Sequence, residues 1–500
     1  MKALYDIISE AIVDGELPED FHLPETTIDG NISWADGAMD GVGVYHMGTR
    51  PIGELQLLLV GNAMDAAGAG DFEKAEHCLR EAVSGKLGDG YALCIMDDMQ
   101  RYIIKNAEKL SPQNVFQFAM HQILTSDHKE CVKLGLAILE LIKSDIDVKI
   151  KSHIMTVALS DEFTLFAIYA ISKWDNANDY IFQLAKKVHG WGRVHAVAAL
   201  KPDTEEIKDW LIKEGVHNGV MAAYSAYECW SKGDAEARLV KELDSEEYAG
   251  IRDIIDGLLD EGPVAGISRL ENQDRYMKAF LKQSQGRKLE ADDYGLIYQL
   301  REHFDRMLDT DEDEPEEVEQ NIDKQSCEEI IGLCDQLLMT EDCKKTISEA
   351  VKGGRYVSLA QFLELDCNHE LIKVLKDDFF HGGYLVDVLM KDSDYVDAVV
   401  DIVREHLPMG KNHMEKYILE HVIMGLRAYP KKGEDLIESG LSSDVPRIRF
   451  VSVAVLDYWV KLTGEKLGDI SPQLYHRLET MSGEEEDEKI LEKLKCLVAE

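Results

Sequence analysis

Two groups of side chains in this chain are of types that could carry chemistry. The first lies in a glycine-rich stretch near the amino terminus and consists of Trp34, Asp36, Asp40 and His46. Carboxylates and an imidazole are the titratable groups expected in a closed polar enzyme pocket. If the chain is an enzyme, we expect its site between residues 15–50 and the first repeats, with these four residues as the ones to mutate.

The second group consists of His189, Trp191, Arg193 and His195, at the start of a predicted helix. A cationic side chain at a helix amino terminus can hold an anion, because the backbone N–H groups of the first turn are free. In the structural interpretation, which we prefer, Trp191 packs between repeats and Arg193 pairs with an acidic neighbour. The sequence leaves both interpretations open.

The amino-terminal stretch also approaches a calcium-binding loop, in which oxygen ligands alternate along a tight turn. The candidate ligands are Asp29, Asn31, Ser33 and Asp40. However, Trp34 stands where such a loop requires glycine, and Asp40 stands where a bidentate glutamate is usual. We therefore predict no metal site.

Cofactor motifs are missing from the sequence. There is no phosphate loop, dinucleotide-binding glycine motif or zinc-protease helix. A di-iron bundle needs Glu-x-x-His pairs on helices. The two such pairs, at 19–22 and 214–217, both straddle helix breakers. We therefore predict no cofactor.

Short helices must position the two groups of side chains. Between 127 and 241, a breaker or capping residue precedes each run of apolar residues at helical spacing. These residues are Asp127, Asp147, Asp161, Asn176, Gly190, Asp203, Asn218 and Asp234. Each apolar run is too short to bury itself alone, so each helix needs a neighbour. Two helices per unit give a period of roughly 30 residues, which is typical of stacked repeats.

Three of these segments resemble the short HEAT-like repeats of bacterial proteins: Asp127–Ile142, Gly190–Leu200 and Asp444–Leu456. In that family an Asp caps a helix, a basic residue follows, and small or aliphatic residues fill the buried face. Asp444 and Arg449 match this pattern best. The resemblance implies an all-α fold, an α-α superhelix of the HEAT or armadillo type, and says nothing of function.

Two further resemblances concern other parts of the chain. Residues 69–83 look like the second half of a tetratricopeptide repeat, with a turn at Gly70-Asp71. The opening and the stretch from Gly190 to Leu200 are similar to an uncharacterised family of long helical proteins from clostridium-like bacteria, some of which carry a limonene hydroxylase label. The sequence contains neither a haem-thiolate cysteine loop nor a dinucleotide motif to support that chemistry.

Composition limits the partners. The chain has 500 residues and a formal net charge of −41. Because nucleic acids and anionic membranes are bound through clustered Lys and Arg, we expect neither as a partner. No apolar run reaches the roughly 18 residues of a membrane span. Nine scattered cysteines without a C-x-x-C pair are typical of a reducing compartment. We therefore expect a cytoplasmic protein.

The pattern divides the chain into five parts. These are an amino-terminal helix and irregular cap segment (1–50), tetratricopeptide-like pairs (51–125), HEAT-like repeats (126–308), an acidic linker (309–325) and carboxy-terminal repeats (326–500). The irregular segment is either a cap over the stack or a functional loop. Within it, a small hairpin or an extended loop is predicted by the apolar residues Ile28, Ile32, Val42, Val44 and Tyr45.

On this evidence we expect a non-enzymatic scaffold or adaptor, which binds a protein partner on the concave face of the helices. Tyr224, Tyr227 and Trp230 lie at helical spacing. We interpret them as core residues, with an exposed partner-binding ridge as the alternative. The rival hypothesis is an enzyme or small-ligand-binding protein with its site at segment 15–50. The sequence does not decide the oligomeric state.

Overall fold

The structure is a computed structural model that describes residues 2–24, 34–86, 90–142, 147–262, 264–309, 322–406 and 413–499. Within these ranges the chain forms helices and no β-strand, apart from an isolated bridge between Val13 and Glu16. The prediction of an all-α protein is therefore confirmed. Among the same residues, no helix has both the length and the apolar composition that crossing a bilayer requires.

The chain divides into two compact units. The first comprises Met1–Arg287 with Gln299–Cys334, and the second comprises Lys288–Tyr298 with Asp335–Glu500. Two helices, α17 (Ala291–Asp309) and α18 (Lys324–Leu338), contribute to both units. Most of the predicted acidic linker lies outside the described residues.

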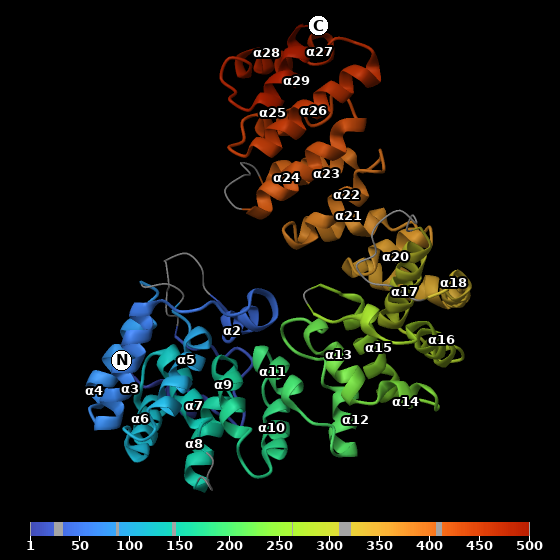
Figure 1. Ribbon diagram of the computed structural model, residues 1–500. Helices are drawn as coiled ribbons and strands as arrows, with labels where there is room; N and C mark the ends of the chain where they lie inside the picture. The colour runs from blue at the N-terminus through green and yellow to red at the C-terminus, as the bar shows by residue number, and fades with distance from the viewer. Residues whose placement is uncertain are drawn as a thin grey trace. The chain divides into compact units, whose positions relative to one another are not determined.

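The first unit contains the helices from α1 to α16 (Figure 1). They are α1 (Leu4–Ala11), α2 (Ala38–Val42), the π-helix η1 (Gly43–Met47), α3 (Glu54–Ala69), α4 (Phe72–Ala82), α5 (Ala92–Lys105), α6 (Pro112–Thr125), α7 (Lys129–Leu139), α8 (Val148–Ala158), α9 (Asp161–Ile171), α10 (Ala177–Ala185), α11 (Trp191–Ala199), α12 (Glu205–Lys213), α13 (Ala223–Lys232), α14 (Ala235–Leu239), α15 (Ser245–Leu259), the 3₁₀ turn η2 (Ile267–Arg269) and α16 (Gln273–Ser284).

Odd-numbered helices of this unit form a row. Helix α3 packs on α5, and contacts continue from α5 to α7, α9, α11, α13 and α15 in order. Helices α4, α6, α8, α10 and α12 each pack against the row. Every residue of α7 from Cys131 to Leu139 is buried, because the helix has neighbours on all sides. The row is therefore the core of the unit.

Asp147 caps α8 with its side chain, as predicted, whereas the predicted Asn176 and Asp234, and also Asn272, begin their helices through the backbone. Asn176, Asp234 and Asn272 precede α10, α14 and α16 with φ values of 56°, 55° and 57°, and none makes a side-chain capping hydrogen bond. This left-handed conformation costs Asn and Asp less than other side chains. The chain can thus turn sharply between successive helices.

The prediction of a hairpin or extended loop at Val42, Val44 and Tyr45 is wrong. These residues lie in α2 and η1, which are five residues long each. So short a helix is not stable alone. It forms here because it lies against the odd-numbered row, and such long-range contacts override local preference. The other residues of the predicted hairpin, Ile28 and Ile32, lie outside the described residues.

The second unit is also helical. It contains α19 (Glu341–Ala350), η3 (Val351–Gly353), α20 (Val357–Phe362), α21 (Asn368–Asp377), η4 (His381–Tyr384), α22 (Leu385–Leu389), α23 (Val396–Glu405), α24 (His413–Gly425), η5 (Leu426–Ala428), α25 (Glu434–Leu441), α26 (Pro446–Thr463), α27 (Leu467–Ile470), α28 (Pro472–Met481) and α29 (Glu488–Ala499). Helices α22, α24, α26 and α29 pack in succession. Trp459 of α26 is fully buried and donates from Nε1 to the Leu426 carbonyl at 2.9 Å.

Candidate functional site

The amino-terminal segment 34–47 lies across the row of odd-numbered helices. Figure 1 shows α2 beside α9 and α11. The Asp36 carboxylate meets Lys129 Nζ at 2.9 Å, and the Asp40 carboxylate meets Lys133 Nζ at 2.7 Å. Because Lys129 and Lys133 are one turn apart on α7, the two ion pairs form a ladder. The structure thus ties two of the predicted site residues, Asp36 and Asp40, to α7.

Lys133 is the centre of a buried charge cluster. Its side chain is 2% exposed, and Nζ also lies 2.6 Å from Glu162 and 3.0 Å from Glu130. Three carboxylates therefore surround one ammonium group. Nearby, Lys129 Nζ lies 3.5 Å from Glu162. The cluster joins α2, α7 and α9.

The carboxylates of this cluster have different proton affinities. Burial raises the pKa of Asp40 to about 7, although Lys133 opposes the shift. Burial also acts to raise the pKa of Glu162, but Lys133 and Lys129 outweigh it and hold that pKa below its ordinary value. Burial alone would lower the pKa of Lys133, yet the three carboxylates raise it. Lys133 is thus charged at neutral pH, and Asp40 is the carboxylate that takes up a proton most easily.

Two glycines allow the segment to approach the row closely. Gly37 has φ +76° and donates its N–H to Glu162 at 3.0 Å. A Cβ atom at Gly41 would collide with the indole ring of Trp191. Helix α2 therefore lies flat on Trp191, and a larger residue at position 41 has no room.

The aromatic part of the contact lies on α11 and α13. Tyr45 stacks on Trp191 and on His195 with ring centroids 6.0 Å apart in both pairs. His46 Nε2 lies 2.6 Å from the Tyr224 hydroxyl. His195 is 4% exposed, burial lowers its pKa to about 4, and its Nε2 has no hydrogen-bond partner among the described residues. His46, Trp191 and His195 are thus brought to one face.

Two of the sequence-predicted residues are not part of this contact. Trp34 is 49% exposed. The sequence predicted that Arg193 pairs with an acidic neighbour. In the described part of the chain it does not pair with a carboxylate. It donates from Nε to the Val188 carbonyl at 2.9 Å and from Nη1 to the His217 carbonyl at 2.7 Å. Its role there is to hold the ends of two loops. Of the calcium-like pattern, Asp29, Asn31 and Ser33 lie outside the described residues.

The sequence interpretation missed Lys129, Lys133, Glu130 and Glu162. The available signal was Lys133, a charged residue in the middle of an otherwise apolar stretch of α7. A lysine is almost never fully buried unless it is paired. Its partners could not be named in advance, because Asp40 lies far from it in sequence.

A cavity of about 450 Å³ lies beside the segment. Its polar lining includes Asp36, Asp161, His22 and His189, and its apolar lining includes Phe21 and Trp191. The Asp161 carboxylate accepts the N–H groups of Gly190 and Gly192, both at 3.0 Å. Burial raises its pKa to about 6 despite these bonds. Asp161 thus already occupies the amino terminus of α11, where an anion was expected.

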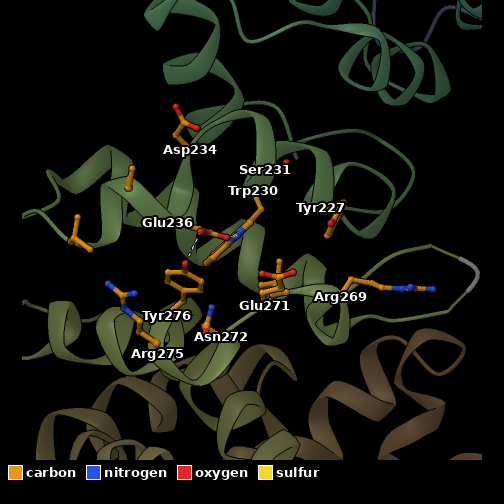
Figure 2. Close-up of a pocket in the computed structure, with 13 residues that line it drawn as sticks. Tyr227, Trp230, Ser231, Asp234, Glu236, Arg269, Glu271, Asn272, Arg275 and Tyr276 are labelled. Carbon is orange, nitrogen blue, oxygen red and sulfur yellow. Dashed lines mark hydrogen bonds between the residues drawn. The ribbon is translucent and has the colours of Figure 1, made fainter. Parts of the chain in front are cut away.

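Another hollow lies elsewhere in the first unit. It measures about 670 Å³ and is formed by α13, α14, η2 and α16 (Figure 2). Trp230, Leu270 and Tyr276 are buried and form its floor. Tyr276 donates its hydroxyl to Glu236 at 2.6 Å, and Trp230 donates Nε1 to the same carboxylate at 3.4 Å. We call this hollow the aromatic groove.

The predicted aromatic stripe is divided between core and groove. Trp230 is 1% exposed, as the core interpretation expected. Tyr227 is half-buried and lines the aromatic groove, where Figure 2 shows it beside Arg269 and Glu271. Tyr224 contacts the segment 34–47 instead, through Tyr45 and His46.

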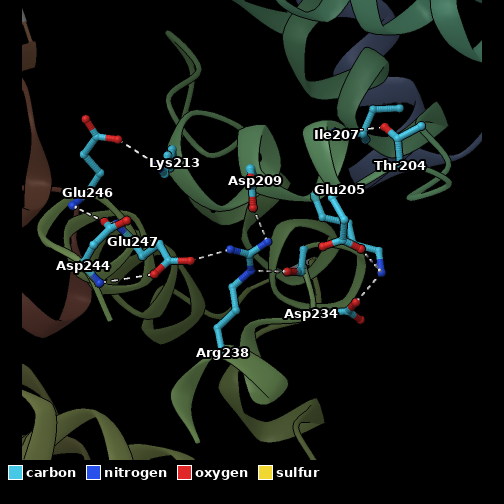
Figure 3. Close-up of polar contacts among 12 residues, drawn as sticks. Thr204, Glu205, Ile207, Asp209, Lys213, Asp234, Arg238, Asp244, Glu246 and Glu247 are labelled. Atoms are coloured by element: carbon cyan, nitrogen blue, oxygen red, sulfur yellow. Dashed lines mark hydrogen bonds and ion pairs between the residues drawn. The ribbon is translucent and has the colours of Figure 1, made fainter. Parts of the chain in front are cut away.

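A second, acidic hollow of about 210 Å³ adjoins the groove and shares Asp234 and Ala237 with it. Figure 3 shows its polar contacts around Arg238. The Arg238 guanidinium binds Asp209 at 2.5 Å and Glu247 at 2.6 Å. Its Nε donates to the Gly233 carbonyl at 3.0 Å. Arg238 is therefore fully engaged inside the protein.

The two hollows together are acidic. Their linings hold seven carboxylates: Asp209, Asp234, Glu205, Glu236, Glu242, Glu247 and Glu271. They hold four basic side chains: Arg238, Lys241, Arg269 and Arg275. An occupant would therefore meet aromatic rings below and an excess of carboxylates around the rim.

Comparison with known proteins adds no assignment to these features: no protein-family model matches the chain, and no curated protein matches it significantly.

Proposed function

We propose that the protein is a non-enzymatic interaction scaffold, a helical-repeat superhelix that binds a basic segment of a partner protein in the aromatic groove. The observation that carries the proposal is the groove itself. It combines a buried aromatic floor, Trp230 and Tyr276, with an open rim of charged side chains. Aromatic anchors surrounded by a polar rim are typical of sites where a partner side chain inserts.

Charge supports a basic partner. The rim has more carboxylates than basic side chains, and Arg238 is neutralised by Asp209 and Glu247. The whole chain carries a formal net charge of −41. A field of one sign attracts partners of the opposite sign and speeds their encounter. Binding should therefore weaken as salt is added, because surface charges are screened.

Exposed apolar surface beside the groove also favours a protein partner. Val240 lines the groove and is 65% exposed. It can be changed without disturbing the core. Ile104, on α5, is 64% exposed and lies away from the groove, so it provides a matched control.

The test has two steps. A partner is first captured from cell extract on the immobilised chain and identified by mass spectrometry. Its dissociation constant is then measured with the wild type, Val240→Arg and Ile104→Arg. We expect Val240→Arg to weaken binding at least about tenfold, because an added cation fills the groove and repels a basic partner. Equal constants for the two variants would contradict the proposal.

A second candidate function has its own observation. The cavity of about 450 Å³ beside Asp36 and Asp161 lies where an enzyme or small-ligand site was predicted. A thermal-shift screen against metals, nucleotides, flavins and small organic acids tests it, since a ligand of the native state raises the melting temperature. A shift that disappears in His22→Ala, whose side chain lines the cavity and is 73% exposed, would favour this candidate.

A further inference from the structure

The segment 34–47 contacts the helix row in the way that a bound peptide would. It crosses α7, α9, α11 and α13 through Asp40, Gly37, Gly41 and Tyr45. Its helices α2 and η1 follow one another without a break over 38–47, and even together they are too short to be stable alone, so their helical shape depends on the row. A peptide that folds on a groove formed by other helices shows the same dependence.

Two glycines bracket the docked helices. Gly37, before α2, has φ +76°, and Gly48, after η1, has φ +66°. Glycine adopts this conformation at no steric cost, so the segment can leave the row by rotation at either end. The outer residues of η1 are exposed, with Val44 at 44% and Met47 at 60%. The segment therefore covers the row without being covered itself.

The contacts define what the row recognises. Two carboxylates four residues apart, Asp36 and Asp40, meet two lysines four residues apart on α7. A glycine must follow the second carboxylate, because Trp191 leaves no space for a Cβ atom. An aromatic ring four residues later, Tyr45, stacks on the α11 surface. Asp36 lies in the turn before α2, whereas Asp40, Gly41 and Tyr45 lie on the helical part, so the pattern is that of an acidic turn followed by a short helix.

The row also has a polar group that the chain's own segment does not satisfy. Nε2 of His195 lies in the contact with Tyr45, is buried and has no hydrogen-bond partner among the described residues. A buried polar atom without a partner costs free energy. A peptide with a hydrogen-bonding side chain at this point would recover that energy and compete with the segment.

We propose that the face of α7, α9, α11 and α13 is a second peptide-binding groove, and that segment 34–47 is its built-in occupant. The partner is an acidic segment in which a turn leads into a short helix, with carboxylates four residues apart, glycine after the second and an aromatic residue four positions further. It displaces α2 and pairs with Lys129 and Lys133. This site is separate from the aromatic groove. Its ligand is acidic, whereas the ligand proposed for the aromatic groove is basic.

The probe is a fluorescent synthetic peptide of residues 34–50, and its binding to the full-length chain is measured by anisotropy. In the wild type the tethered segment competes at an effective concentration of about millimolar, so binding is weak. Gly41→Val forces α2 off Trp191 and leaves the row unchanged. Gly53→Val is the control, because a Cβ atom there meets nothing closer than 3.9 Å.

We expect Gly41→Val to bind the peptide at least about tenfold more tightly than the wild type or Gly53→Val. A peptide that itself carries Gly41→Val, or Asn at both Asp positions, should not bind. Val240→Arg should leave peptide binding at the wild-type level, which separates this proposal from the aromatic groove.

A second full-length variant covers the case in which Gly41→Val fails to fold. Asp36→Asn combined with Tyr45→Ala removes one ion pair and one ring contact without overpacking. Hydrogen exchange at 38–47 reports undocking in either variant. Undocking without peptide binding would overturn the proposal, and so would unchanged protection of 38–47 in both folded variants.

Discussion

Asp40 Oδ2 lies 2.7 Å from Lys133 Nζ, and each side chain is only 2% exposed. The pair joins the amino-terminal segment to the middle of the helix row. Burying two charges costs several kcal/mol of desolvation each, which their attraction offsets only in good geometry. Because Glu130 and Glu162 also contact Lys133, the lysine keeps partners when α2 leaves. The contact can therefore open without stranding the cation.

Replacing Lys133, in contrast, should leave buried carboxylates without a partner and destabilise the fold. Lys133→Met leaves Asp40, Glu130 and Glu162 buried without their shared cation, and we expect a loss of about 3–5 kcal/mol in the free energy of unfolding. Urea denaturation, followed by hydrogen exchange in α7, measures it. Lys352→Met removes an exposed pair with Glu349 and should leave the free energy of unfolding close to that of the wild type. Similar values for both variants would show that the cluster contributes little.

Asp40 gives the docked segment a pH dependence. Its pKa rises from 3.8 in the unfolded chain to about 7 in the folded chain, so its favourable contribution is complete below pH 3.8 and lost as the pH rises to about 7. The charged groups around it are Lys133, Glu130 and Glu162.

Asp40→Asn removes this titration, and the groups outside the cluster titrate alike in both proteins. We expect the stability of Asp40→Asn relative to wild type to increase between pH 5 and pH 8, measured by urea denaturation. A difference that stays constant over this range would mean that Asp40 keeps an ordinary pKa.

His195 should make the stability of the protein depend on pH in the acid range. Burial lowers its pKa from 6.5 to about 4, so the unfolded chain takes up a proton first, and stability falls as the pH drops from 6.5 to about 4. His195→Phe keeps a ring against Tyr45 and Trp191 and removes the titration. The stability of His195→Phe relative to wild type should therefore rise as the pH falls from 6.5 to about 4. A difference that stays constant over this range would contradict the prediction.

Two neighbouring arginines of α26 should differ in importance. Arg449 binds both oxygens of Glu485 at 2.8 Å and donates to the Ser443 carbonyl at 3.0 Å. The Glu485 side chain is 3% exposed, and its hydrogen bonds with Arg449 lower its pKa to about 2. We expect Arg449→Ala to lower the free energy of unfolding of the second unit by about 2–3 kcal/mol.

The control is Arg447→Ala. Arg447 pairs with Glu420 at 2.7 Å, but its side chain is 77% exposed. Such pairs contribute about 0–1 kcal/mol. Thermal and urea denaturation should therefore show a larger loss of stability for Arg449→Ala than for Arg447→Ala. Equal losses would indicate that the burial of Glu485 adds nothing.

The helices of the row could be predicted from the sequence, because the patterns that indicate each helix are local. The residues that begin α10 and α14, Asn176 and Asp234, stand out beside apolar residues at helical spacing. The all-α class followed from many such signals. Whether the row continues as a superhelix depends on small rotations between neighbours, which no single segment encodes.

The candidate sites could be predicted only in part from the sequence, because their contacts join residues that are far apart in the chain. Asp36 and Asp40 stand out in the sequence, but no local pattern connects them to Lys129 and Lys133. Likewise, helical spacing identified Trp230 as a core residue, whereas its groove partner Tyr276 comes from a different helix. Pairings between distant segments are decided by the fold as a whole.

The docked segment also constrains the order of events during synthesis. Residues 34–47 leave the ribosome before α7, α9, α11 and α13, on which they lie. Chains grow at about 5–20 residues per second, so the segment waits for roughly ten seconds or more until α13 is completed. A nascent chain therefore exposes Asp40 and Tyr45 to other molecules before the whole of their docking surface exists.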